Sequence, residues 1–436
     1  MAKTEANSVF DRLSKSILTD AFRVVMDLEK SRGAVFIDAR TGEDYIDFFS
    51  FFASNPIGFN HPRLSEPEFE KDLLRVAKIK VSNSDVYTTD LADFISYFHE
   101  HFASQFDKLF FIEGGGLGVE NALKAAQDWK AQKNLAAGHK TEGGQVLHFK
   151  KAFHGRTGYT LSLTNTVPDK TRYFPKFDWP RVTHPSLNFP TTPESLEDVK
   201  KREALSIEEI KRAFQDRPHE ICAIIIEPIQ GEGGDNFVRK EFLQELKRLS
   251  LENDALLVFD EVQTGLGITG KVWAYEHFGV KPDLLAFGKK VQVGGCAADL
   301  SRLNEVEHVF KVSSRINSTW GGNLTDMLRS LQFMKIIREE NLLEHVRKLG
   351  EEMLGSLREL SAKEARMTNV RGLGLWMAFD LPDQATRDRY LKSCWANRLM
   401  ILSCGDRSIR LRPVLNLTKQ EAEQGLDRLK KSFDSL

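Results

Sequence analysis

The feature that most constrains the fold of this chain is a series of short apolar runs that do not alternate with polar residues. Five such runs occupy residues 108–112, 145–149, 222–226, 255–259 and 283–287. A strand with one solvated face alternates between apolar and polar residues, whereas a strand buried on both faces is apolar throughout. We therefore expect these runs to be central strands of a sheet that other elements cover on both faces.

A helical pattern separates the first two runs. Within residues 118–133, Val119, Leu123, Ala126 and Lys130 recur at helical spacing, with Ala122 beside them. Strands that alternate with helices are typical of an open, mostly parallel α/β sheet. The sequence thus predicts an α/β fold with a mostly parallel central sheet in its large domain.

The length of 436 residues is sufficient for more than one hydrophobic core. Residues 160–205 are rich in Pro, Thr and Asn, and we expect them to form a long excursion over the sheet. Charged amphipathic helices are expected over 324–363, followed by strands within 367–381, 399–404 and 408–413. We predict an N-terminal segment (1–55) that packs with the small domain, a large domain (56–325) and a small α+β C-terminal domain (326–436).

Composition excludes several classes of protein. The chain has 61 Lys and Arg against 62 Asp and Glu, so no global field would attract nucleic acid or an anionic membrane. It has neither an apolar run of about 18 residues nor a secretory signal at its start. Its four cysteines are too scattered for a zinc site or a disulfide framework. We expect a cytoplasmic protein without metal, nucleic acid or membrane partners.

A first glycine-rich segment, GLGITG (265–270), matches the dinucleotide-binding fingerprint G-x-G-x-x-G. In that fingerprint the turn follows the strand directly, whereas here four residues separate Asp260 from Gly265. Only about eight residues follow before Gly279, which is too short for a crossover helix. The context therefore argues against a nicotinamide or flavin site.

A second glycine-rich segment, EGGGLGVEN (113–121), lies where a predicted strand turns into a helix. It lacks the G-K-[ST] ending of a nucleotide-binding P-loop. Glycines at such a turn let backbone N–H groups and the positive end of the helix approach a phosphate. The alternative is a tight turn without a ligand.

An acid and a lysine follow two neighbouring runs. Asp260 and Glu261 end the run at 255–259, and because side chains alternate along a strand, only one of them can face a given cleft. Lys289 and Lys290 follow the next run, where a semi-buried lysine is typical of Schiff-base chemistry. Alone, either feature could be a loop-capping acid or a surface lysine. Together with the glycine-rich turn they are the three groups that pyridoxal 5'-phosphate (PLP) requires.

The sequence resembles the class III (ω) aminotransferases of PLP fold type I over essentially its whole length. The strings that carry the resemblance are FFIEGGGLGVENALKAA, FHGRTGYTLSLTN, IIIEPIQGEGGD, VFDEVQTGLGITG, AFGKKVQVGG and STWGGN. Within this class it is most similar to the lysine 6-aminotransferases, on the strings SNSDVY, FPKFDWPR and SRINSTWGGNLTDM.

The resemblance implies roles at the cofactor. The Schiff-base lysine would be Lys289, because it follows Gly288 and keeps the spacing to Asp260; a count from the following glycine pair would favour Lys290 instead. Asp260 would keep the ring nitrogen protonated. The other implied cofactor residues are Gly115 and Gly116 at the phosphate, Thr319 reaching it from the partner subunit of a homodimer, Gln263 at the ring oxygen, Phe153 stacked on the ring, and His154 beside it.

The resemblance also implies roles at the substrate. Arg156 would bind one carboxylate, and Arg410, rather than Arg412, a second one, since arginine suits bidentate recognition. Glu232 would pair with Arg410 when an ω-amine donor leaves that guanidinium unoccupied. Asn317 would contact the substrate, and Glu227 would support the pocket. Gly116 and Gly118 depart from the family, where alanine or another small residue is usual, and would loosen the phosphate-binding turn.

The function implied is transfer of the ε-amino group of L-lysine to 2-oxoglutarate. Its products would be 2-aminoadipate 6-semialdehyde, which cyclises to a piperideine carboxylate, and L-glutamate. Lys289 would act as the proton carrier in a ping-pong reaction. One alternative is another donor, such as ornithine or 4-aminobutyrate. A second alternative is a PLP-binding protein without catalytic activity.

Overall fold

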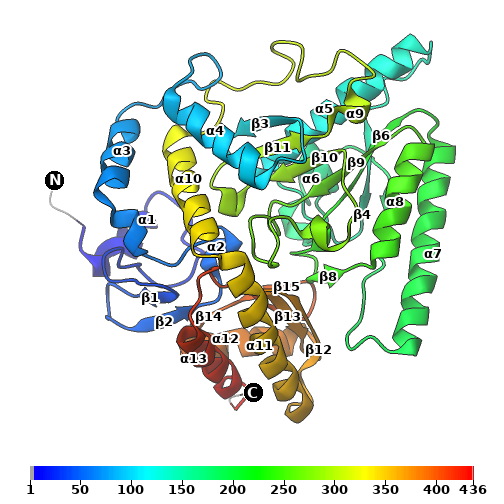
Figure 1. Cartoon of the computed structure of the whole chain (residues 1–436). Helices are drawn as coiled ribbons and strands as arrows, with labels where there is room; N and C mark the ends of the chain where they lie inside the picture. The colour runs from blue at the N-terminus through cyan, green and yellow to red at the C-terminus, as the bar shows by residue number, and fades with distance from the viewer. Residues whose placement is uncertain (1–3, 435) are drawn as a thin grey trace.

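A seven-stranded sheet forms the centre of the computed structural model, which describes residues 4–434 and 436 (Figure 1). Its strand order is β3-β11-β10-β9-β6-β4-β5. β11 pairs antiparallel with β10 and β3, and the remaining pairs are parallel. The mostly parallel α/β sheet is therefore confirmed. The strands are β3 (Lys108–Ile112), β4 (Gln145–Phe149), β5 (Arg181–Val182), β6 (Ile221–Ile226), β9 (Leu256–Asp260), β10 (Leu284–Phe287) and β11 (Gly294–Ala298).

Each central strand contributes side chains to two hydrophobic cores, one on each face of the sheet. In β6, Ile224 and Ile226 belong to one core, and Ala223 and Ile225 to the other. The same division holds in β9 and β10. Burial on both faces is the physical reason why these runs show no polar alternation.

Helices cover both faces of this sheet (Figure 1). α5 (Gly115–Ala136) packs on one face, and its predicted apolar positions Val119, Ala122, Leu123 and Ala126 are buried there. Lys130 is buried as well, and its Nζ donates to the Asp254 carbonyl at 2.7 Å. The core on the other face includes side chains from α4 (Thr89–Phe102), α7 (Pro193–Asp216) and α8 (Lys240–Glu252).

Strand β11 was not indicated by the sequence, because its GGCAA composition has little strand propensity. Close packing explains the glycines. A Cβ on Gly294 would lie 2.1 Å from the Gly114 carbonyl oxygen, and one on Gly295 would lie 2.2 Å from that of Phe110. The strand therefore leaves room for the turn that precedes α5.

The predicted excursion over residues 160–205 is only partly irregular. It contains the end of α6 (Gly158–Leu163), the short helix η3 (Pro168–Lys170) and the edge strand β5. From Pro193 onward the chain is the helix α7, which the prediction missed. Thr192 caps this helix and a proline occupies its first position, both of which are helix-start signals.

A second, antiparallel sheet with the order β12-β13-β16-β15 lies below the first in Figure 1. As predicted, two long helices precede it, α10 (Leu324–Glu339) and α11 (Leu342–Lys363). Its strands are β12 (Thr368–Leu373), β13 (Trp376–Asp380), β15 (Leu402–Cys404) and β16 (Ser408–Leu411), and α12 (Gln384–Ala396) and α13 (Lys419–Lys431) accompany it.

The two ends of the chain meet in a third sheet. β1 (Val35–Ile37) pairs with β2 (Asp44–Asp47), and β2 pairs in parallel with β14 (Leu399–Met400). The blue N-terminal segment accordingly lies beside the red C-terminal helix in Figure 1.

The remaining elements are α1 (Val9–Leu13), α2 (Ser50–Ala53), α3 (Pro67–Ala77), β7 (Ile229–Gln230), β8 (Asn236–Phe237), α9 (Leu300–Leu303) and the short helices η1 (Ala6–Ser8), η2 (Pro62–Ser65), η4 (Ala274–His277) and η5 (Lys289–Val291).

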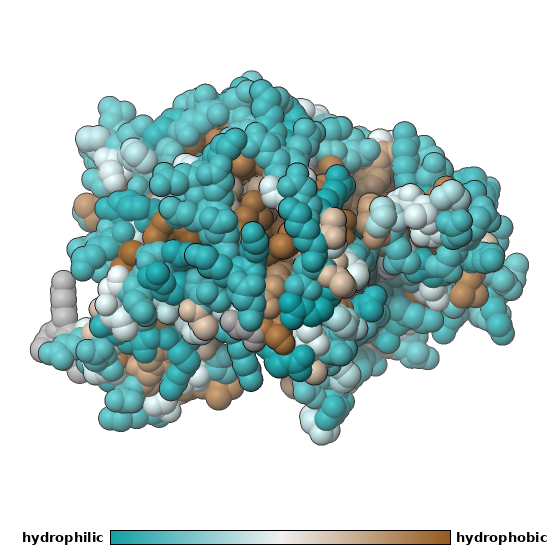
Figure 2. Space-filling model, turned by 90° about the horizontal axis from the view of Figure 1, so that it is seen from below, coloured by the Kyte–Doolittle hydropathy of each residue, from teal (hydrophilic) through white to brown (hydrophobic). Residues whose placement is uncertain are grey.

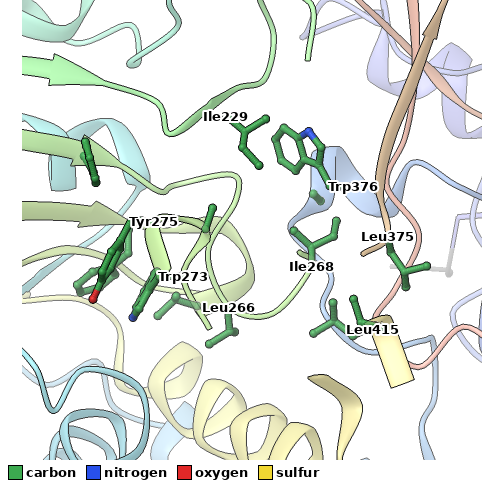
Figure 3. Close-up of a cluster of buried hydrophobic side chains, with 14 of the residues drawn as sticks. Ile229, Leu266, Ile268, Trp273, Tyr275, Leu375, Trp376 and Leu415 are labelled. Atoms are coloured by element: carbon green, nitrogen blue, oxygen red, sulfur yellow. The ribbon is translucent and has the colours of Figure 1, made fainter. Parts of the chain in front are cut away.

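The glycine-rich segment 265–270 belongs to the loop between β9 and η4, which contacts the second sheet. Figure 3 shows Ile268 in a buried cluster that also contains Leu375 and Leu415. The Leu375 amide donates to the Ile268 carbonyl at 2.9 Å. A Cβ on Gly265 would lie 2.4 Å from the Trp273 ring, so glycine is required there by packing. The segment starts no crossover helix, which agrees with the argument against a dinucleotide site.

Hydrophilic residues predominate on the face of the molecule seen in Figure 2, with smaller hydrophobic areas between them. Among the residues that the structure describes, no helix combines the length and the apolar composition needed to cross a membrane.

Candidate active site

A pocket opens at the carboxyl ends of the central strands. Five strands supply its residues: the segments after β3, β4, β6, β9 and β10 each contribute to the lining. Ligands of open α/β sheets bind at this edge. The pocket is lined by Gly115, Gly116, Phe153, His154, Gly155, Glu227, Ile229, Glu232, Asp260, Val262, Gln263, Thr264 and Lys289.

The turn between β3 and α5 forms one wall of the pocket. Gly114 has a φ of 89°, which favours glycine, and α5 begins directly after it. The backbone N–H groups of Gly115 and Gly116 lie in the first turn of α5, where no intrahelical partner is available. Free amides and the positive helix end form a ready anion site for the phosphate of a cofactor.

The two unusual glycines of α5 differ in their surroundings. A Cβ on Gly116 would lie no closer than 3.7 Å to any neighbour, whereas one on Gly118 would lie 2.6 Å from the Gly295 carbonyl oxygen. Gly118 is therefore required where α5 crosses β11. The expectation that Gly118 only loosens the phosphate-binding turn omitted this packing contact, because β11 was not predicted.

A buried acid–histidine pair lies opposite that turn. Asp260, at the end of β9, is 5% exposed, and its Oδ2 lies 2.8 Å from His154 Nδ1. Its Oδ1 accepts from the Val262 amide at 3.0 Å. Glu261 points away from the pocket and accepts from the amides of Ala274 and Tyr275, as alternation along the strand predicts.

Glu227, which follows β6, joins two loops of the pocket. Its Oε1 accepts from the Phe153 amide at 3.1 Å and its Oε2 from the Gly231 amide at 2.8 Å. Burial raises the pKa of this carboxyl to about 7, although nearby His154 opposes the shift. Glu227 thus holds the loop of Phe153 and the loop that leads to Glu232.

The two adjacent lysines have different environments. Lys289 is half-buried and lines the pocket, and its backbone φ of 49° is unusual for a residue other than glycine. Burial and the charge of Arg410 lower the pKa of its amine to about 7. Lys290 is buried away from the pocket, where its Nζ donates to the Gln263 carbonyl at 2.8 Å.

Arg410, in β16, and Arg412, just after that strand, also differ in their surroundings. Arg410 is 3% exposed, and its Nη1 lies 3.4 Å from Gln263 Oε1. Its guanidinium carbon lies 5.9 Å from the centre of the Phe52 ring. Arg412 forms a buried ion pair with Asp235 and so has a structural partner already.

In this structure, Glu232 is not paired with Arg410, the partner expected for it when an ω-amine donor is bound. Its Oε1 instead pairs with Lys170 Nζ and accepts from Thr166 Oγ1 at 2.9 Å. Lys170 is the last residue of η3 in the excursion over the sheet, and no motif of the sequence marks it. Only the folded chain brings it to Glu232.

Four predicted substrate or cofactor residues are absent from the lining of this pocket. Arg410 lies beside it, next to Gln263. Arg156 is exposed on the loop after β4. Asn317 lines a separate groove beside residues 83–96, and the Thr319 carbonyl accepts from Ser82 Oγ in the same region. The structure therefore does not place Asn317 and Thr319 in the pocket of their own chain.

The residues of the pocket fit PLP by their chemistry. An anion-binding helix start, a buried carboxylate and a half-buried lysine converge from three strand ends. With its pKa lowered to about 7, about half of the lysine amine is unprotonated at neutral pH. His154 Nε2 is buried without a hydrogen-bond partner among the described residues, so this nitrogen is available to a bound group.

Comparisons with known proteins agree with this chemistry. The family profile described as "Aminotransferase class-III" matches residues 19–433. The L-lysine-epsilon aminotransferase of Streptomyces clavuligerus is 46% identical, over 99% of this chain and 95% of that protein. A probable mitochondrial 4-aminobutyrate aminotransferase of Caenorhabditis elegans is 31% identical, over 99% of this chain and 92% of that protein.

A solved structure, "Lysine aminotransferase from M. tuberculosis in the internal aldimine form", superposes with a TM-score of 0.96 at 43% identity. The match covers 99% of each chain. The protein therefore belongs to the class III aminotransferases and is a PLP-dependent aminotransferase of fold type I.

Proposed function

We propose that this enzyme transfers the ε-amino group of L-lysine to 2-oxoglutarate, giving 2-aminoadipate 6-semialdehyde and L-glutamate. The observation that carries the proposal is the half-buried Lys289 amine in a pocket shared with Asp260 and the start of α5. The choice of lysine as donor is supported by the similarity to the L-lysine-epsilon aminotransferase over nearly its full length. A 4-aminobutyrate donor has weaker support, because that relative is only 31% identical.

Lys289 is proposed as the covalent attachment point of the cofactor and as the proton carrier. Its pKa of about 7 leaves much of the amine unprotonated at neutral pH, which both roles require. When bound, PLP supplies an electron sink for the pair left on the substrate carbon. The Lys289 amine would then take the proton from Cε of the donor and return it to the cofactor's aldehyde carbon.

The remaining pocket residues would bind and orient. The amides of Gly115 and Gly116 would hold the phosphate, and the Asp260 carboxylate, fixed by His154, would keep the ring nitrogen protonated. Phe153 would stack on the ring and Gln263 would bond its oxygen. Glu227, which follows β6, accepts from the Phe153 amide and so fixes the position from which Phe153 would stack on the ring.

Charge would select the substrates. Arg156 and Arg410 would each bind a carboxylate, so that the pocket accepts the dicarboxylate 2-oxoglutarate as well as the donor. Arg410 is buried beside the pocket, next to Gln263, whereas Arg156 lies on an exposed loop. A dicarboxylate bound to both arginines would bring its reacting carbon to Lys289.

The test is a donor panel with 2-oxoglutarate as acceptor. The purified enzyme is incubated with L-lysine, L-ornithine or 4-aminobutyrate, and both glutamate and the cyclised semialdehyde are quantified. We expect the highest kcat/KM with L-lysine. Turnover of 4-aminobutyrate with none of L-lysine would contradict the donor assignment, and no turnover with any amine would favour the non-catalytic alternative.

A homodimer is proposed because Thr319 and Asn317 lie outside their own pocket. Exposed apolar side chains accompany them: Tyr87 is 80% exposed, Val86 59% and Trp320 38%. A second copy covering this region would bury these side chains and bring Thr319 and Asn317 to its partner's site. We also propose the division into domains at residues 55 and 325, and a cytoplasmic location.

Mixing two inactive variants tests this arrangement. Lys289→Ala and Thr319→Ala chains, mixed and allowed to exchange, should form hybrid dimers with one intact site, restoring up to about a quarter of the wild-type activity. The two variants kept apart are the control. No gain on mixing, with exchange verified by mass, would contradict the shared site.

A further inference from the structure

Glu232 is paired with a cation that the known roles of the site do not include. Lys170 Nζ contacts Glu232 Oε1, to which Thr166 Oγ1 also donates at 2.9 Å. The side chains of Lys170 and Glu232 are 24% and 19% exposed, so the pair is partly shielded from water. The Lys170 ammonium also lies 5.3 Å from the centre of the Phe153 ring, which favours a cation in this position.

Arg410 is left open by this pairing. It is 3% exposed, and its Nε has no hydrogen-bond partner in the part of the chain that the structure describes. Its side-chain hydrogen bond to Gln263 is long at 3.4 Å. A buried guanidinium with unused donors attracts a carboxylate strongly, whether from a substrate or from Glu232.

We propose that Lys170 is a specificity-determining residue that holds Glu232 away from Arg410 and so keeps Arg410 available to dicarboxylate acceptors. The inference rests on the proposed function for the role of Arg410. Because the Glu232 carboxylate can pair closely with only one of the two cations at a time, Lys170 and Arg410 compete for it. The affinity for an acceptor falls in proportion to the fraction of molecules in which Glu232 covers Arg410.

Removing the Lys170 charge shifts this competition. In Lys170→Met the Glu232 carboxylate keeps only the Thr166 hydroxyl, and the attraction to Arg410 is no longer opposed. If Arg410 is then free in a tenth of the molecules, the dissociation constant of a dicarboxylate rises about ten-fold. Lys170→Arg retains the cation and should bind like the wild type. An ω-amine donor leaves Arg410 without a carboxylate, so its KM should change far less.

The experiment is calorimetric titration of the PLP-loaded enzyme with glutarate, a dicarboxylate that has no keto group. Wild type, Lys170→Met and Lys170→Arg are compared with Lys176→Met. Lys176 lies in the same segment but donates to the carbonyls of Thr171 and Phe174, so its loss changes the charge without touching Glu232. We expect weakening of about ten-fold in Lys170→Met alone.

Repeating the titration in a Glu232→Gln variant tests whether Lys170 acts through Glu232. In Glu232→Gln chains no carboxylate competes for Arg410, so adding Lys170→Met should have no further effect on glutarate binding. Equal binding by wild type and Lys170→Met, or an equal loss in Lys176→Met, would overturn the inference. Because glutarate binding requires no amino transfer, this outcome is distinct from failure of the proposed function, which would appear as absent L-lysine turnover in the wild type.

Discussion

Replacing Lys289 and Lys290 in turn separates the two adjacent amines. Lys289→Ala should abolish turnover and the visible absorbance of a lysine-bound cofactor, because the remaining amine of Lys290 is buried against the Gln263 carbonyl. Lys290→Met should keep both. It leaves that carbonyl without a partner, at a cost of about 1–3 kcal/mol in the free energy of unfolding.

The lowered pKa of Lys289 sets how the rate of PLP binding should depend on pH. The pKa of Lys289 is lowered from 10.5 to about 7, so at neutral pH the unprotonated fraction exceeds that of an ordinary lysine by about 1000-fold. Capture of PLP by the cofactor-free wild type should rise with pH and level off above about pH 7. An amine with an ordinary pKa would continue to gain rate up to about pH 10.

The same shift predicts how stability depends on pH. Between about pH 7 and 10.5 the unfolded chain binds the Lys289 proton and the folded, cofactor-free chain does not. The contribution of Lys289 to stability therefore increases as the pH rises through this range, and Lys289→Ala should remove it. Absorbance titration and denaturant unfolding of both variants are the assays. A coloured, active Lys289→Ala enzyme beside a colourless Lys290→Met enzyme would refute the assignment.

Further substitutions test the packing and the buried charges. Gly118→Ala should lower the free energy of unfolding by about 1–3 kcal/mol, because its Cβ would meet the Gly295 carbonyl. Gly116→Ala should be neutral or stabilising by up to about 1 kcal/mol. Denaturant titrations that give the reverse order of stability would contradict this. Asp260→Asn should keep the bound cofactor but lower kcat on the order of 100-fold or more in steady-state assays. An unchanged kcat would argue against its role. Asp235→Ala should cost about 3–5 kcal/mol by leaving the Arg412 charge buried and unpaired, and a loss below about 1 kcal/mol in thermal unfolding would be evidence against it.

Several features of this protein are determined by the sequence alone. The apolar runs identify central strands, because burial on both faces is a property that each strand carries in its own residues. The glycine-rich turn, Asp260 and Lys289 are ordered along the chain at strand ends, and parallel strands necessarily bring those ends to one edge. Family resemblance added the proposed roles of Gln263 and Phe153, which no periodicity could indicate.

Only the tertiary structure decided the rest, because those features depend on contacts between segments far apart in the chain. Strand β11 contains glycines because α5 and the turn at Gly114 pack closely against it, whereas strand propensity alone predicts a loop for the same residues. Lys289 and Lys290 are the same residue type in the sequence, and only the fold directs the Lys290 side chain towards the Gln263 carbonyl. Glu232 likewise pairs with Lys170 and not with Arg410, since the charge nearest to a carboxylate is set by the packing of the fold and not by any spacing in the sequence.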